Sequence, residues 1–214
     1  CVPNTIIYSF LKKIKSNFFY IGAQNCHYYE TSGPYTGSVN ASMLKKLGTK
    51  YIILGHSENR QSGDTNFIIK KKIESALKQN FNVIFCIGET FKEKMSGKTF
   101  STLRNQLKSS LNKKFKLANI IIAYEPVWSI GTGKVPTPEE LKKIFKFIKI
   151  EFKKNFKHKK DLHVLYGGSV NEVNIKKFSI IDDIDGFLIG GASQSSKKFI
   201  DIIKNYYKKR TWKI

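Results

Sequence analysis

Apolar residues in this chain fall into two alternating kinds of segment. Short, mostly apolar runs predict strands, at residues 18–23, 51–54, 83–87, 120–124, 162–166 and 187–189. Longer segments, in which apolar residues recur every three or four positions, predict helices at residues 6–15, 41–47, 67–79, 99–112, 138–152, 171–176 and 197–208. The alternation predicts repeated strand–helix units around a parallel sheet, with functional residues just after each strand.

The segment from Ala123 to Lys134 carries the strongest chemical signal. An apolar run ends in Glu125, a stiff Pro126-Val127-Trp128 step follows, and Gly131-Thr132-Gly133 forms a flexible turn. This order predicts a buried carboxylate beneath a loop with a rigid first limb and a mobile tip. Closure of such a loop desolvates the acid and makes it a strong base near neutral pH. The alternative for a single Glu at this position is a solvated strand-end residue.

Four further motifs follow strands in the same order as in one enzyme family. They are Gly22-Ala23-Gln24-Asn25, Gly55-His56-Ser57-Glu58, Tyr166-Gly167-Gly168-Ser169-Val170 and Gly190-Gly191-Ala192-Ser193. Together with the segment around Glu125, they resemble the strand ends of triosephosphate isomerase. The resemblance extends from the first residues to about Ser193. It implies an α/β fold, the (β/α)8 TIM barrel, as a single domain over residues 1–214.

The resemblance implies roles for individual residues. Glu125 corresponds to the catalytic base and His56 to a neutral electrophile, an arrangement of which triosephosphate isomerase is itself a standard example. Glu58 corresponds to a residue that pairs with the family's catalytic lysine. The substrate phosphate would be held by backbone N–H groups and one hydroxyl of Gly131, Ser169, Gly190 and Gly191. The resemblance implies no metal and no organic cofactor.

The activity implied is that of an aldose–ketose isomerase of glycolysis and gluconeogenesis. It would interconvert dihydroxyacetone phosphate and D-glyceraldehyde 3-phosphate by proton transfer through an enediolate. A second enzyme interpretation is another phosphate-binding barrel with different chemistry. That interpretation explains the glycines, but it does not explain His56 and Glu125 beside this loop.

Composition narrows the class of protein. With 214 residues and 41% hydrophobic residues, the chain is long enough for one domain with a sizeable core. No apolar run approaches the roughly 18 residues that a membrane span needs, so we expect no membrane partner. Cys1, Cys26 and Cys86 are odd in number and lack the spacing of metal ligands. They indicate a reduced, cytoplasmic setting rather than a disulfide framework.

The net charge of +22 raises the alternative of a basic nucleic-acid-binding protein. Such proteins favour arginine, but only Arg60, Arg104 and Arg210 occur here. The lysines fall mostly in helix-like stretches such as Lys70-Lys71-Lys72. We interpret them as a solvated surface produced by the codon bias of an AT-rich genome, with no nucleic-acid partner. The charge should still attract an anionic substrate, more weakly as salt rises.

The first residues resemble the end of the family's second strand. The family's first strand and helix, with its catalytic lysine and a neighbouring asparagine, would precede Cys1-Val2-Pro3-Asn4. We therefore expect the chain to be a fragment of a longer protein that is incomplete at its N-terminus. The alternative is a truncated barrel that is catalytically impaired or is completed by a separate partner.

A polar loop from Tyr28 to Gly37 resembles the family's third loop, which docks into a second subunit with Thr36 near its tip. The resemblance implies a homodimer, although the loop's own residues are those of an ordinary polar loop. Ser38 and Asn59 stand where the family usually has an acid and an arginine. Pro136 stands at the end of the flexible loop, where it would stiffen the motion.

Overall fold

The computed structural model describes residues 1–14, 18–115, 117–156, 161–178 and 180–208. Its strands form one parallel sheet in the order β1-β2-β3-β4-β5-β6, so each strand pairs with its neighbours along the chain. Their bounds are β1 Gly22–Ala23, β2 Tyr51–Leu54, β3 Asn82–Ile87, β4 Ile120–Tyr124, β5 Val164–Tyr166 and β6 Gly186–Phe187. This consecutive parallel order confirms the predicted succession of strand–helix units.

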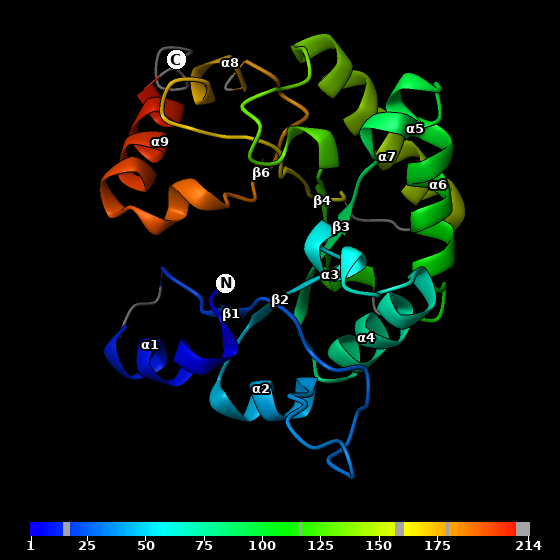
Figure 1. Ribbon diagram of the computed structural model, residues 1–214, viewed down its shortest axis with the longest axis vertical. Coiled ribbons are helices and arrows are strands. Elements are labelled where there is room, and N and C mark those ends of the chain that lie inside the picture. The colour runs from blue at the N-terminus through cyan, green and yellow to red at the C-terminus, as the bar shows by residue number, and fades with distance from the viewer. Residues whose placement is uncertain (15–17, 116, 157–160, 179, 209–214) are drawn as a thin grey trace.

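Helices connect the strands and lie outside the curled sheet, with α1 near one end of the row of strands and α9 near the other (Figure 1). The α-helices are α1 Ile7–Lys13, α2 Ala41–Leu47, α3 Ser57–Gln61, α4 Asn66–Lys78, α5 Phe91–Met95, α6 Thr99–Ser110, α7 Pro138–Phe156, α8 Ile175–Phe178 and α9 Ser196–Lys208. Short 3-10 helices are η1 Asn4–Ile6, η2 Leu117–Asn119, η3 Val127–Ser129 and η4 Gly191–Gln194. Among the described residues, no helix combines the length and apolar character needed to cross a membrane.

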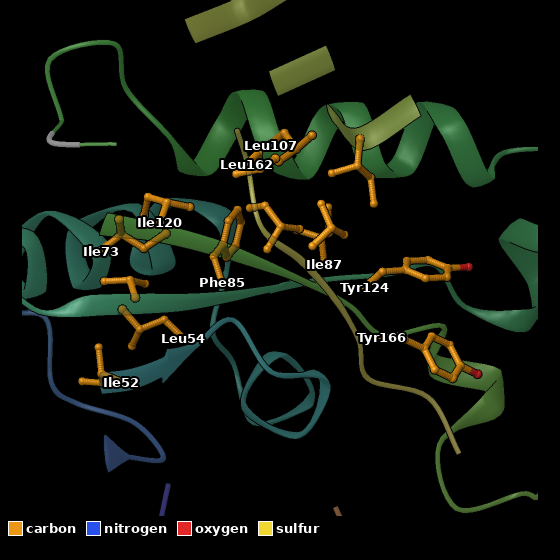
Figure 2. Packing of buried hydrophobic residues seen from close by; sticks show 14 of the residues in the cluster. Ile52, Leu54, Ile73, Phe85, Ile87, Leu107, Ile120, Tyr124, Leu162 and Tyr166 are labelled. Atoms are coloured by element: carbon orange, nitrogen blue, oxygen red, sulfur yellow. The ribbon is translucent and has the colours of Figure 1, made fainter. Parts of the chain in front are cut away.

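The two faces of the sheet bury different side chains, because successive strand residues point to opposite faces. The helix-facing side carries large residues such as Phe85, Tyr124 and Tyr166, which belong to the main apolar cluster (Figure 2). The opposite, inner face carries a small cluster of Ile53, Ile84, Cys86 and Ala123. On β4, odd-numbered residues such as Ala123 therefore point to the inner face of the curled sheet.

Three predicted strands are shorter in the structure than in the sequence pattern. The run 162–166 forms a strand only at Val164–Tyr166. The run 18–23 forms a strand only at Gly22–Ala23, and Phe18, Phe19 and Tyr20 ahead of it are 90%, 68% and 58% exposed. The run 187–189 is likewise reduced, to Gly186–Phe187. An isolated parallel bridge between Val2 and Ala23 extends the pairing beyond β1.

Each of the seven predicted helices overlaps a helix of the structure, with three differences. The pattern at 171–176 gives a helix only at Ile175–Phe178, while Asn171 accepts hydrogen bonds from the N–H groups of Val173 and Asn174 ahead of it. The short helices α3 and α5 have no apolar period and were not predicted. The prediction 6–15 includes residue 15, which lies outside the described residues.

Helix α7 begins at Pro138, directly after Thr137. Thr137 Oγ1 accepts from the N–H of Glu140, and Glu140 Oε2 accepts in return from the N–H of Thr137. This reciprocal cap satisfies two backbone donors at the helix start and fixes where the loop after β4 ends.

Candidate active site

Glu125 follows the last residue of β4 and lies on the inner face of the sheet, two positions after Ala123. Its backbone N–H donates to Ile87 O of β3, and its residue is only 3% exposed. Gly167 makes room for it, since a Cβ there would lie 2.8 Å from Glu125 Cγ. The carboxylate is therefore buried, as the sequence predicted, and its position is set by three neighbouring strands.

His56 lies opposite this carboxylate. It follows β2 after Gly55, and its Nε2 is 3.0 Å from Glu125 Oε1. Its Nδ1 accepts from the backbone N–H of Glu58 at 3.3 Å. These contacts assign the proton to Nε2, because the same ring must accept at Nδ1 and donate toward the carboxylate. The structure thus brings together the two residues that the sequence assigned to proton transfer.

The two contacts of the ring act on its pKa in opposite directions. The hydrogen bond to Glu125 raises the pKa of His56, burial lowers it, and the charges of Glu125 and Glu58 raise it further. Acceptance of the Glu58 N–H favours the neutral ring, since a protonated Nδ1 could not accept. A neutral His56 can therefore donate from Nε2 to Glu125 Oε1.

A cavity of about 370 Å³ opens beside this pair. Its lining includes Pro3, Asn4, Gln24, Asn25, Ile53, His56, Glu58 and Asn59. The Glu58 side chain is 82% exposed, with its Oε2 3.8 Å from His56 Nδ1. Within the described ranges, no group of three or more His, Cys, Asp or Glu residues is placed to hold a metal ion.

Behind this cavity lies a buried polar cluster that the sequence did not indicate. Lys72 is only 6% exposed, and its Nζ donates to Asp64 at 2.7 Å and to Asn25 Oδ1 at 3.1 Å. The Asn25 amide in turn donates to Asn59 Oδ1 at 2.8 Å. The interpretation of Lys72 as part of a solvated surface was therefore wrong. Its partner Asp64 lies eight positions earlier, before the start of α4, and that spacing carries no sequence signal.

Residues 126–137, here called the lid loop, connect Glu125 with α7. Its first limb is held by a residue that the sequence analysis missed: Glu89 accepts from Trp128 Nε1–H at 2.9 Å and from the Tyr124 hydroxyl at 3.1 Å. Burial raises the pKa of Glu89, and these hydrogen bonds oppose that rise. Lys94 Nζ lies 3.9 Å from the centre of the Trp128 ring and adds a cation–π contact.

The tip of the lid loop is a tight turn. Gly131 and Gly133 have φ values of 69° and 74°, the left-handed region that glycine adopts without steric cost. The Thr132 hydroxyl lies between them and donates to Trp128 O at 3.0 Å. Gly131 is exposed, whereas Pro136 is buried near the start of α7.

The other residues assigned to phosphate binding follow the last two strands. Ser169 is half-buried after β5, and its N–H donates to Ser129 Oγ of the lid loop at 3.2 Å. Gly190 and Gly191 are exposed after β6, and Gly191 begins η4, where the first N–H groups have no intrahelical acceptor. Their position at the carboxyl ends of parallel strands is the edge at which sites form in such sheets.

The remaining predicted residue, Thr36, lies away from the pair of His56 and Glu125. It is exposed in the long loop between β1 and α2, which extends beyond the body of the molecule (Figure 1). All three cysteines are free; Cys86 is fully buried on the inner face, where burial and the charge of Glu125 raise its pKa.

A parallel strand–helix fold with a buried carboxylate against an imidazole, and glycine turns after its last two strands, is the architecture of TIM-barrel enzymes. Comparison with known proteins makes the class specific. The family model described as triosephosphate isomerase matches residues 1–206. The chain belongs to the triosephosphate isomerase family, and its relatives are isomerases by name.

Individual relatives agree with the family model. The triosephosphate isomerase of Chloroherpeton thalassium is 43% identical over 190 residues, which cover 86% of this chain and 75% of that protein. That of Borreliella burgdorferi is 43% identical over 209 residues, covering 95% and 82%. The crystal structure of the Bartonella henselae triosephosphate isomerase has a TM-score of 0.87 at 34% identity and covers 97% of this chain and 84% of that one.

Proposed function

We propose that this chain interconverts dihydroxyacetone phosphate and D-glyceraldehyde 3-phosphate, a step of glycolysis and gluconeogenesis. The observation that carries the proposal is the 3.0 Å contact between Glu125 Oε1 and His56 Nε2 on the inner face of the sheet. The reaction moves a proton between neighbouring carbons and passes through an enediolate. It needs one base that reaches both carbons and one donor to their oxygens.

Glu125 acts as the base in this proposal. Its carboxylate removes a proton from the carbon beside the carbonyl and returns it to the adjacent carbon, so no net charge is left on the protein. Burial of Glu125 to 3% exposure removes competing water and strengthens the carboxylate as a base toward a bound substrate.

His56 supplies the donor. The Nε2–H that contacts Glu125 in the free protein would turn to the substrate oxygens, where His56 gives this proton to the carbonyl oxygen and takes up the hydroxyl proton of the neighbouring carbon. Its neutral form suits an enediolate because the two acidities are close. The Nδ1 contact with Glu58 N–H at 3.3 Å keeps the proton on Nε2 during this exchange. Glu58, with an exposed carboxylate lining the cavity beside His56, is proposed to pair with a cation that balances the substrate's charge.

The phosphate is proposed to bind the backbone N–H groups of Gly131, Ser169, Gly190 and Gly191, aided by the exposed start of η4. Closure of the lid loop over it would keep water from the enediolate, which otherwise loses phosphate. The net charge of +22 would draw the anionic substrate toward the site.

The direct test is isomerase activity of the purified protein with D-glyceraldehyde 3-phosphate, coupled to reduction of the product by NADH. We expect turnover, and we expect 2-phosphoglycolate, an enediolate-like anion, to raise the midpoint of thermal unfolding. A protein that neither turns over this substrate nor binds 2-phosphoglycolate would contradict the proposal. Weak binding of duplex DNA that disappears in moderate salt would be the expected control result.

A homodimer formed through the loop after β1 is part of the same proposal. Its aromatic rings are stacked: Tyr29 and Tyr35 have centroids 3.6 Å apart, and His27 lies 5.0 Å from the Tyr29 ring. This stacking holds the ends of the loop together and leaves Thr36 exposed at its tip. A pre-formed, exposed loop is suited to docking into a second copy of the chain.

A further inference from the structure

Ser129, the last residue of the first limb of the lid loop, has a fully buried side chain with three partners. Its Oγ donates to Lys134 O at 2.6 Å, accepts from the Ser169 N–H at 3.2 Å and lies 3.2 Å from the Tyr166 hydroxyl. Its residue is 0% exposed. One hydroxyl therefore joins the two limbs of the lid loop to each other and to the turn after β5.

The single proton of the Ser129 hydroxyl determines which atom donates in its contact with the Tyr166 hydroxyl. A serine hydroxyl has one proton and two lone pairs. The proton must go to Lys134 O, because a carbonyl oxygen has none to offer. Both lone pairs then accept, from the Ser169 N–H and from the Tyr166 O–H. The proton and both lone pairs of the Ser129 hydroxyl therefore have partners. A new acceptor for the Ser169 N–H must take the place of Ser129 Oγ.

The surroundings of this hydroxyl are closely packed. A Cβ on Gly168 would lie 2.7 Å from Ser129 Oγ and 2.3 Å from the Tyr166 hydroxyl. Burial raises the pKa of Tyr166 to about 12, so its hydroxyl keeps its proton and remains a donor at neutral pH. The contact between the Ser169 N–H and Ser129 Oγ joins the turn after β5 to the lid loop.

We propose that Ser129 is a positioning residue whose hydroxyl holds the Ser169 N–H in the free protein and competes for it with the substrate phosphate. The inference rests on the proposed function, in which Ser169 donates to that phosphate. A phosphate oxygen carries charge and is a stronger acceptor than a hydroxyl, so the ligand wins the exchange. Loss of this contact removes the hydrogen bond that joins the lid loop to Ser169 when the phosphate arrives.

The test is binding of inorganic phosphate to the Ser129→Ala variant, measured by calorimetric titration. Removal of the competing hydroxyl should tighten binding about 3- to 10-fold, the value of one hydrogen bond. Tyr166→Phe is the matched control, because it removes one partner of the same oxygen but leaves the Ser169 contact in place. Its affinity for phosphate should not increase. Unchanged or weaker binding by Ser129→Ala would overturn the proposal.

Two further measurements test whether Ser129 competes with phosphate for the Ser169 N–H. Ser129→Cys places a larger but weaker acceptor at the same position and should shift the affinity in the same direction, about twofold. In the unmodified protein, the amide resonance of Ser169 should move when inorganic phosphate is added; a resonance that stays in place overturns the proposal even if neither variant folds.

Failure of this inference differs from failure of the proposed function. If the unmodified protein turns over D-glyceraldehyde 3-phosphate and binds 2-phosphoglycolate, but Ser129→Ala binds inorganic phosphate with the same affinity as the unmodified protein, only the role of Ser129 is excluded. An unmodified protein without turnover and without ligand binding removes both.

Discussion

Tyr124 and Tyr166 are register partners on the neighbouring strands β4 and β5, and their hydroxyls support the lid loop in two ways, through Glu89 and through direct contact. The Tyr124 hydroxyl donates to Glu89, which also holds Trp128, while the Tyr166 hydroxyl contacts Ser129. Both rings extend toward the same end of the sheet (Figure 2). The core that packs the strands against the helices thus also fixes the first limb of the lid loop.

Glu89→Ala should test how firmly that limb is held. The change leaves the Tyr124 O–H and the Trp128 Nε1–H without their acceptor, and Tyr124 is fully buried. We expect a loss of about 2–4 kcal/mol in the free energy of unfolding, measured with urea. Tyr124→Phe, which leaves Glu89 its contact with Trp128, should lose only about 1 kcal/mol. Equal losses would mean that Glu89 does not serve two donors.

Glu125→Gln removes the proposed base while keeping its shape. We expect turnover to fall by about 10²-fold or more, since a neutral amide cannot accept the substrate proton. The rate is measured in the coupled assay with D-glyceraldehyde 3-phosphate. Glu139→Gln, at an exposed carboxylate in the first turn of α7, is the matched control and should keep nearly full activity. A Glu125→Gln variant as active as this control would exclude Glu125 from the role.

The hydrogen bond from His56 to Glu125 predicts a pH dependence. This contact raises the pKa of His56 in the folded protein. It therefore stabilises the fold fully when the pH is below the pKa of histidine in the unfolded chain, about 6.5, and this stabilisation is lost as the pH rises through the pKa of His56 in the folded protein. The free energy of unfolding of the unmodified protein, relative to Glu125→Gln, should therefore be greater at about pH 5.5 than at about pH 9.

Proton NMR of the imidazole checks the same contact directly. The His56 resonance should titrate with a midpoint above that of an unperturbed histidine in the unmodified protein, and at lower pH in Glu125→Gln. The exposed His163 serves as an internal reference and should not respond to the substitution. An identical His56 midpoint in both proteins would show that the contact with Glu125 does not control the ring.

The buried ion pair of Lys72 and Asp64 should matter to stability far more than its surface counterparts. Lys72→Met leaves a carboxylate that is 13% exposed without its cation, and should cost about 3–5 kcal/mol in the free energy of unfolding. Lys78→Met, which breaks exposed pairs with Glu30 and Glu74, is the control and should change the urea midpoint little. The double change Lys72→Met with Asp64→Leu should recover part of the loss, because it leaves no unpaired charge.

The sequence predicted the parts of this fold that depend on local pattern. β2 and β4 have the predicted bounds because their residues are buried on both faces and read as continuous apolar runs. Residues 18–20 did not follow the pattern: aromatic residues favour strands because they pack on a half-buried sheet surface, but these three side chains are exposed. The two residues Glu125 and His56 could be predicted, because each lies within two positions of the end of a strand.

Sequence reasoning could not find the residues that act through contacts distant along the chain. Glu89 is the second residue after β3, but only the folded chain brings Trp128 to it across 39 positions. Lys72 looked like its neighbours in a basic run, and only its position against Asn25 and Asp64 separates it from them. Ser129 has the same limit: its three partners come from the lid loop and from β5 and the turn after it.

The proposed dimer depends on Thr36, which is exposed at the tip of the loop after β1. Thr36→Arg adds a bulky charge that would have to be desolvated in an interface, so it should shift the protein toward monomer. Analytical ultracentrifugation over a range of concentrations measures this shift. Ser109→Arg, at an exposed hydroxyl on α6, adds the same charge elsewhere and should leave the association unchanged. If both variants sediment like the unmodified protein, the loop around Thr36 is not the interface, and its stacked tyrosines only stabilise the loop itself.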